Sequence, residues 1–106
     1  MSITNANTKN YNELIKDGFK IVDFYSTTCV PCKAFGRLLE DTVMELPFLD
    51  VVKINITDYP LIGKENNVEA VPTVLFMKNG VQVDREVGLL SEDELTEKIS
   101  RHYYGE

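Results

Sequence analysis

The 106-residue sequence contains no tryptophan, a single histidine and only two cysteines, Cys29 and Cys32. Two cysteines can form at most one internal disulfide, and a chain in which 43% of the residues are hydrophobic does not need one to fold. A disulfide that closes so short a loop would also restrict the unfolded chain less than a long-range one. The scarcity of cysteine therefore argues against a structural disulfide framework.

Basic residues are also scarce, with 11 Lys and Arg against 17 Asp and Glu, which gives a formal net charge of −6. They are scattered and form no basic cluster, so we expect no nucleic-acid partner. The polar N-terminal stretch lacks the charged start and apolar run of a secretory signal, and no segment is long enough to cross a bilayer. We therefore expect a soluble, cytoplasmic protein with no membrane partner, folded as a single domain over residues 1–106.

Hydrophobic periodicity and turn residues divide the chain into alternating helices and strands. Residues 19–25, "FKIVDFY", have the near-continuous apolar character of a strand covered on both faces. Asn79-Gly80 is the strongest hairpin signal, and Ser91 with Glu94 forms a capping box that starts the last helix. The remaining predicted elements are a short helix from Tyr11 that stops at Gly18, a helix from about Pro31 to about Leu46, a strand at 50–57, a short helix and loop at 58–70, and strands on both sides of the hairpin turn within 72–88. Helices between the early strands imply parallel pairing, so we predict an α/β fold with a mixed sheet and helices on both faces.

The two cysteines stand where the strand at 19–25 passes into the following helix, in the stretch "TTCVPCK". At the start of a helix, Cys29 faces unpaired backbone N–H groups and the positive end of the helix dipole, which favour a thiolate. Pro31 loses no hydrogen bond at an early helical position, and its fixed φ holds the turn so that the two sulfurs can approach. Cys32, one turn into the helix, is expected to be more buried. This asymmetry suits an exchange in which Cys29 attacks a substrate disulfide and Cys32 resolves the mixed disulfide.

Two alternative roles for the cysteine pair stay open from the residues alone. The pair could supply half of a zinc site, but such a site takes four ligands, and the one histidine, His102, lies seventy residues further along the chain. The cysteines could also be inert thiols, although Thr27, Thr28 and Lys33 around them do not form an apolar burial site. We favour the redox pair and expect no metal.

Beyond this motif, the sequence resembles the thioredoxin family over about residues 11–104. The stretch "VDFYSTTCVPCK" is similar to the family's strand and active site, and "VVKINIT" to its next strand. "VEAVPTVLFMKNG" resembles the family's cis-proline segment, and "VGLLSEDEL" resembles the approach to its last helix. The resemblance implies a thioredoxin fold, in which a central mixed sheet lies between helices, with Cys29 and Cys32 at its rim and Pro72 opposite them.

The resemblance gives roles to two charged residues. Asp23 aligns with the family's buried carboxylate beneath the active site, which implies that it accepts a proton from Cys32, through water. Burying a carboxylate without a partner is costly and raises its pKa; the alternative is that Asp23 lies at a solvated edge. Lys53 matches the family's lysine near that carboxylate, and the alternative is an ordinary surface lysine.

The resemblance also implies a substrate groove. Pro72 matches the family's proline with a preceding cis peptide bond, and Val71 would offer backbone hydrogen bonds to an extended substrate. Gly88 would complete the groove by lacking a side chain. The alternatives are a plain turn proline and a turn glycine. Further substrate contacts are expected from three residues of the active-site stretch, Thr28, Val30 and Pro31.

The sequence departs from the usual family pattern at four positions. Thr28 and Tyr25 stand where tryptophans are common, so we expect a more polar groove. Val30 stands where glycine is commonest, and Arg37 stands where many members have a helix-kinking proline. From these departures we infer a straighter second helix and a narrower choice of partners.

The resemblance favours a thiol-disulfide oxidoreductase that reduces protein disulfides, with electrons from an NADPH-dependent, flavin-containing thioredoxin reductase. No bound cofactor is implied, because the dithiol itself carries the electrons, and we expect a monomer. One alternative is a disulfide oxidant or isomerase, although related sequences with those roles tend to have histidine in place of Pro31. Another is a non-redox binding or scaffold module of the same fold. Fold alone decides none of these.

Overall fold

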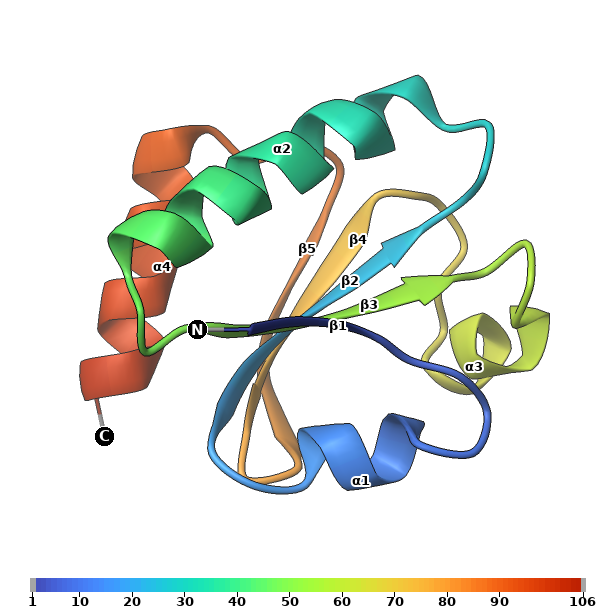
Figure 1. Ribbon diagram of the computed structural model, residues 1–106, viewed down its shortest axis with the longest axis horizontal. Helices are drawn as coiled ribbons and strands as arrows, with labels where there is room; N and C mark the ends of the chain where they lie inside the picture. The colour runs from blue at the N-terminus through green and yellow to red at the C-terminus, as the bar shows by residue number, and fades with distance from the viewer. Residues whose placement is uncertain (1, 106) are drawn as a thin grey trace.

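The structure is a computed structural model that describes residues 2–105 (Figure 1). In chain order its elements are β1 (Ser2–Asn5), α1 (Tyr11–Ile15), β2 (Phe19–Tyr25), α2 (Val30–Glu45), β3 (Asp50–Asn55), α3 (Pro60–Glu65), β4 (Thr73–Lys78), β5 (Val81–Val87) and α4 (Glu92–Tyr104). No helix in this part of the chain is long and apolar enough to cross a membrane. The predicted strand at 19–25 and the predicted hairpin at Asn79-Gly80 are both present.

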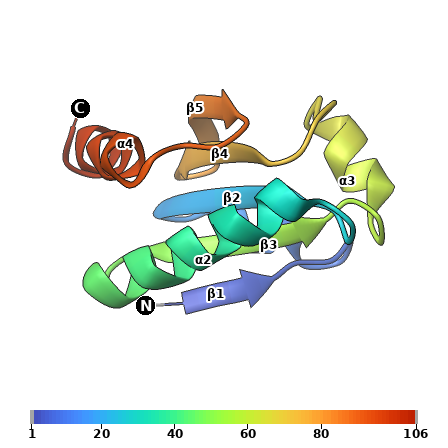
Figure 2. The ribbon, with the colours of Figure 1, turned by 90° about the horizontal axis from the view of Figure 1, so that it is seen from above.

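The five strands form one mixed sheet in the order β1-β3-β2-β4-β5. β3 pairs in parallel with both β1 and β2, whereas β4 pairs antiparallel with both β2 and β5. Figure 2 shows β1 and β5 at the two edges of the sheet. The predicted α/β fold with parallel early strands and an antiparallel hairpin is therefore confirmed, and β2, which leads into the cysteine-bearing turn, is the central strand.

Alternation along β2 divides the core into two layers. Phe19 and Ile21 pack with residues of α2 and α4, whereas Val22 and Phe24 pack with residues of α1 and α3. Figure 1 shows these two pairs of helices on opposite sides of the sheet. Because successive side chains of a strand point to opposite faces, Asp23 shares the α2 face with Phe19 and Ile21. The centre of the sheet therefore carries a carboxylate on the side where the cysteine-bearing helix packs.

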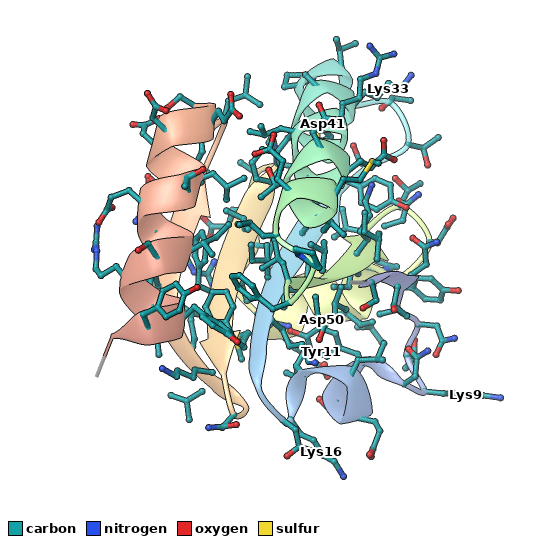
Figure 3. The ribbon with its side chains drawn as sticks, turned by 60° about the vertical axis from the view of Figure 1, so that its left-hand side comes forward. Lys9, Tyr11, Lys16, Lys33, Asp41 and Asp50 are labelled. Atoms are coloured by element: carbon teal, nitrogen blue, oxygen red, sulfur yellow. A yellow bond between two sulfur atoms is a disulfide. The ribbon has the colours of Figure 1, made fainter. Side chains whose placement is uncertain are left out.

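The first element differs from the sequence-based prediction, which began with the helix at Tyr11. Ser2–Asn5 form an additional edge strand, paired in parallel with β3, and the Ser2 hydroxyl donates a hydrogen bond of 2.7 Å to Asp50. This strand is largely exposed and polar, so it lacks the apolar pattern by which strands are recognised. After it, Tyr11 is buried between α1 and the sheet (Figure 3).

Candidate active site

Cys29 and Cys32 lie at the N-terminus of α2 and are joined by a disulfide, with their Cα atoms 5.2 Å apart. Cys29 is the N-cap residue, with an extended backbone, and its Sγ accepts a hydrogen bond of 3.1 Å from the backbone N–H of Cys32. Pro31 lies in the first turn, where a missing N–H breaks no helical hydrogen bond. A thiolate at Cys29 would therefore be stabilised by a backbone N–H and by the positive end of the helix dipole.

The two sulfurs differ in their access to solvent. Cys32 is buried, with 4% of its surface exposed, whereas Cys29 is half-buried and the neighbouring Val30 is 73% exposed. The predicted asymmetry is therefore present. An incoming disulfide can reach the outer sulfur, while the inner sulfur is accessible chiefly to the residue that it would have to attack.

The segment before β4 lies opposite the cysteines. The Val71-Pro72 peptide bond is cis, and the carbonyl oxygen of Val71 lies 3.9 Å from the Sγ of Cys29. In the disulfide form Cys29 has no proton to donate, so this contact becomes a hydrogen bond only when the thiol is reduced. On the other side, the N–H of Gly88 donates a hydrogen bond of 2.8 Å to the carbonyl of Pro72. The structure thus brings together four residues from three separate parts of the sequence.

Gly88 has a φ of +95°, a conformation that L side chains rarely adopt. A Cβ built at this position would meet no atom of the described residues within 4 Å. The backbone conformation, and not a close contact, is therefore what requires glycine here.

Asp23 is fully buried, and neither of its carboxylate oxygens has a hydrogen-bond partner among the described residues. The ammonium of Lys53, on the paired residue of β3, lies 4.0 Å from its Oδ2. Burial raises the pKa of Asp23 to about 6, and the charge of Lys53 opposes part of this rise. A solvated edge position, the alternative considered for Asp23, is wrong.

Lys53 is not an ordinary surface lysine. Its side chain is 21% exposed, and its ammonium lies over the ring of Tyr25, 4.8 Å from the centroid, as well as beside Asp23. The aromatic ring and the carboxylate together hold the cation beside the centre of the sheet. Tyr25, which stands where the family commonly has tryptophan, therefore acquires a contact that the sequence did not indicate.

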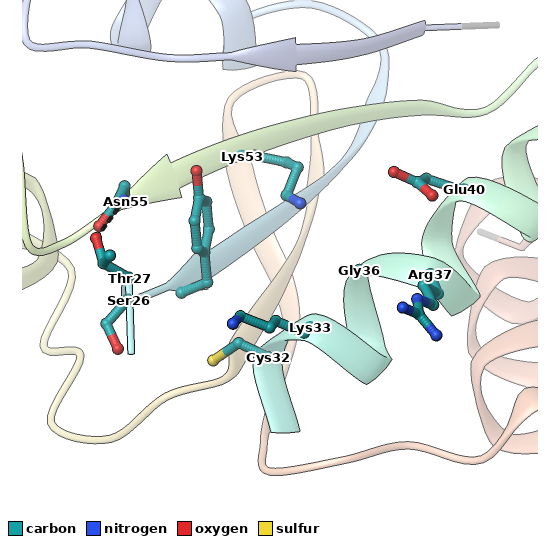
Figure 4. Close-up of a pocket in the computed structure, with 10 residues that line it drawn as sticks. Ser26, Thr27, Cys32, Lys33, Gly36, Arg37, Glu40, Lys53 and Asn55 are labelled. Carbon is teal, nitrogen blue, oxygen red and sulfur yellow. Dashed lines mark hydrogen bonds between the residues drawn. The ribbon is translucent and has the colours of Figure 1, made fainter. Parts of the chain in front are cut away.

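A pocket of about 490 Å³ opens beside these residues (Figure 4). It is bounded by the end of β2, the first turns of α2, and β3, and its lining includes Tyr25, Cys32, Lys33, Gly36, Arg37 and Lys53. The buried Cys32 and the partly exposed Lys53 thus lie at the same pocket. α2 itself runs unbroken through Arg37 from Val30 to Glu45.

His102, the one histidine that could have served as a metal ligand, lies on α4 and not at the cysteines. Its Nε2 is 2.9 Å from the carboxylate of Asp84 on β5, which also accepts a hydrogen bond of 2.6 Å from Lys98. Within residues 2–105 no group of three or more His, Cys, Asp or Glu side chains is arranged to hold a metal ion. The geometry at Cys29 and Cys32 is that of a dithiol–disulfide pair.

The fold and this cysteine pair define a thiol-disulfide oxidoreductase. The Thioredoxin family model matches residues 2–101, and the chain belongs to the thioredoxin family. The chain is 34% identical to a thioredoxin of Chlamydia caviae over 97 residues, which cover 92% of this chain and 95% of that protein. It is 31% identical to a thioredoxin of Staphylococcus haemolyticus over 103 residues, which cover 96% and 99% of the two chains.

Solved structures show the same architecture. A mutant thioredoxin from Halobacterium salinarum superposes with a TM-score of 0.85 at 25% identity, covering 96% of this chain and 90% of that chain. Thioredoxin f2 of Chlamydomonas reinhardtii gives a TM-score of 0.87 at 22% identity, covering 98% and 99%, which supports the fold alone. The expected thioredoxin fold is therefore confirmed.

Proposed function

We propose that the protein reduces disulfides of other proteins in two exchange steps, with Cys29 as nucleophile and Cys32 as resolving residue. The Cys29 thiolate attacks one sulfur of the substrate disulfide, so that a mixed disulfide forms and one substrate thiolate leaves and takes up a proton. The Cys32 thiolate then attacks the Cys29 sulfur and releases the second substrate thiol. The substrate gains two electrons and two protons, and the protein ends with the Cys29–Cys32 disulfide. The unequal burial of the two sulfurs is the observation that carries this assignment.

In this proposal Asp23 accepts the proton of Cys32 before the resolving step. Its oxygens make no hydrogen bond to the described protein atoms, so they are free to accept a proton, directly or through water. Its pKa of about 6 makes the carboxylate predominantly ionised at neutral pH and still able to take up a proton. Lys53 favours the ionised form from 4.0 Å.

Substrate recognition is proposed for the surface between the start of α2 and the segment Val71-Pro72. Within residues 2–105 the backbone of Val71 forms no backbone–backbone hydrogen bond, so it can pair with an extended substrate as an added strand. The exposed side chains of Thr28 and Val30 supply one polar and one apolar contact beside Cys29. Pro31 and Gly88 would line the same surface.

We further propose that an NADPH-dependent, flavin-containing thioredoxin reductase returns electrons to the Cys29–Cys32 disulfide. Disulfide-containing proteins would be the substrates, and the protein would act as a cytoplasmic monomer. Support comes from the thioredoxins that the chain resembles over almost its full length. The dithiol carries the electrons, so no further cofactor enters the reaction.

Two cysteine variants test the proposal. With dithiothreitol as electron donor and insulin as substrate, Cys29→Ser should lose all reduction above the background, because the nucleophile is missing. Cys32→Ser, reduced beforehand and mixed with insulin after the dithiothreitol has been removed, should instead accumulate a mixed disulfide through Cys29. Neither Cys32 nor an added thiol is then present to resolve it, and mass spectrometry of the trapped complex would identify the bond. The double variant is the control for background thiol chemistry. Full turnover by Cys29→Ser would refute the assignment.

The direction of electron flow needs a second measurement. The fraction of Cys29–Cys32 disulfide should be measured in glutathione buffers of defined potential by alkylation and mass spectrometry. A disulfide that persists until the buffer is strongly reducing is the expected result for a reductant. Complete reduction in a mildly oxidising buffer would instead identify an oxidant or isomerase.

A further inference from the structure

Gly36 occupies a position in α2 that the helix itself does not explain. It lies in the interior of the 16-residue helix and is buried. Glycine is among the poorest residues for a helix interior, because it loses the most backbone freedom on folding. Its backbone is helical and has none of the positive φ values found at Gly18, Gly80 and Gly88, so a special conformation does not require it. The presence of glycine at position 36 must therefore be explained by the residues that surround it.

A Cβ at Gly36 would meet one atom of the described residues within 4 Å, the Nζ of Lys53, at 3.3 Å. That distance is shorter than an ordinary van der Waals contact, so a Cβ here would oblige the flexible end of Lys53 to shift by a few tenths of an ångström, and a larger side chain would oblige it to shift further. Figure 4 shows the Lys53 amine directed at the part of α2 that contains Gly36. The missing side chain therefore leaves a notch in the helix into which the lysine extends.

The position of this ammonium is fixed on its other sides as well. The carboxylate of Asp23 lies 4.0 Å from it, and the centroid of the Tyr25 ring lies 4.8 Å from it. The direction that remains open is the pocket beside α2, which opens to the surface. An ammonium displaced from the notch would move into that pocket, where water solvates it, and away from the carboxylate.

We propose that Gly36 is a positioning residue, which keeps the Lys53 ammonium beside Asp23 by leaving room for it against α2. The inference rests on the proposed role of Asp23 as proton acceptor for Cys32. Because the attraction between two charges falls with distance, a displaced ammonium would stabilise the carboxylate less. A side chain at position 36 would thus raise the pKa of Asp23 further above its ordinary value.

Other titratable groups surround the same space and are the same in every variant of the test. They are Tyr25 at the end of β2, Asp58 after β3, and Cys32, Lys33, Arg37 and Glu40 on α2. The cysteines are held as the disulfide during the titration, so they take up no protons. Any change between variants can then be assigned to Asp23 and its distance from Lys53.

The test is a carboxyl-carbon NMR titration of Asp23 in the oxidised protein, for the wild type, Gly36→Ala and Gly36→Met. We expect the midpoint to move to higher pH in the order Gly, Ala, Met. The pH profile of insulin reduction should move in the same direction. In a Lys53→Gln background, used as the control, the same substitutions should leave the midpoint unchanged, because the displaced charge is gone. An unchanged or lowered midpoint in the Gly36 variants with Lys53 present would overturn the proposal.

A purely structural role predicts a different result. Alanine favours a helix over glycine under either role, so the melting temperature does not separate them; a purely structural glycine would leave the Asp23 titration unmoved. Ala34→Gly is the matched control, since it makes the reverse change at an exposed position of the same helix. It should lower the melting temperature and leave the titration midpoint alone.

The Lys53→Gln variant alone separates this inference from the proposed function. If it leaves both the Asp23 midpoint and the pH profile unchanged, the proposed contribution of Lys53 fails, and the role of Gly36 fails with it. If Lys53→Gln raises the midpoint and the Gly36 variants do not, only the positioning role of Gly36 fails.

Discussion

Replacing Asp23 with asparagine should make the protein more stable at neutral pH, although it removes the proposed proton acceptor. Burial raises the pKa of this carboxyl from its ordinary 3.8 to about 6, even with Lys53 opposing the rise. Asparagine has nearly the same shape and no charge to lose or gain. The variant therefore isolates the ionisation of Asp23 from its packing.

The direction of this effect on stability follows from how Asp23 binds its proton in the folded chain and in the unfolded chain. Below about pH 4 the folded and unfolded chains both hold the proton, and ionisation makes no difference to stability. Between about pH 4 and pH 6 only the unfolded chain releases it, so the free energy of unfolding falls as the pH rises. Above about pH 6 both states are ionised and the full loss persists. The two pKa values lie about two pH units apart, which at about 1.4 kcal/mol per unit corresponds to about 3 kcal/mol.

Urea unfolding of the oxidised wild type and Asp23→Asn between about pH 4 and pH 7.5 measures this loss. The variant's free energy of unfolding minus that of the wild type should rise by about 3 kcal/mol over the range. Asp50→Asn is the control, because burial tends to raise the pKa of Asp50 but hydrogen bonds from Ser2 and Lys20, together with nearby positive charge, lower it below its ordinary value. For Asp50→Asn, the free energy of unfolding minus that of the wild type should fall as the pH rises, and by less than the change expected for Asp23→Asn. Parallel curves for Asp23→Asn and wild type would refute the reasoning, since they would mean that the carboxylate is as well solvated when folded as when unfolded.

Two further changes test contacts that secure α4. Burial tends to raise the pKa of Asp84, but hydrogen bonds from Lys98 and His102 outweigh it and lower the pKa to about 2. Asp84 therefore contributes stability above about pH 4 that is lost as the pH falls towards 2. Asp84→Asn should lower the free energy of unfolding at about pH 6 by about 1–2 kcal/mol. Urea unfolding at about pH 2 should show no such difference between the variant and the wild type. Ser91→Ala removes the hydroxyl that accepts a hydrogen bond of 3.1 Å from the N–H of Glu94. The free energy of unfolding should fall by about 1 kcal/mol at any pH. An unchanged urea midpoint would show that the capping box contributes little.

Features that depend on neighbouring residues in the sequence were predictable. The hairpin at Asn79-Gly80 was identified because the turn needs positive φ, and the two residues have φ of +52° and +82°. The capping box of Ser91 and Glu94 forms in both directions. The central strand at 19–25 was recognised by its apolar run, which results from burial on both faces.

Features that depend on the packing of distant segments were not predictable from these patterns. Ser2–Asn5 pair with β3 through their backbone while their side chains are largely exposed, so no hydrophobic alternation marks them. The contact of Lys53 with Gly36 depends on the register of β2 and β3 and on where α2 crosses them. A glycine inside a helical pattern was the one available signal, and on its own it indicates only a local weakness.

The residues that weaken the fold locally gather around the cysteine pair. Asp23 places a carboxylate without a hydrogen-bond partner among the described residues in the middle of the sheet. Gly36 places a poor helix former inside α2, and Gly88 holds a backbone conformation that other residues avoid. Elsewhere local preference and tertiary packing agree, as in the hairpin and the last helix. A fold with a continuous core on both faces of its sheet can tolerate these three positions. Asp23→Asn should therefore increase stability at neutral pH and at the same time impair proton transfer from Cys32.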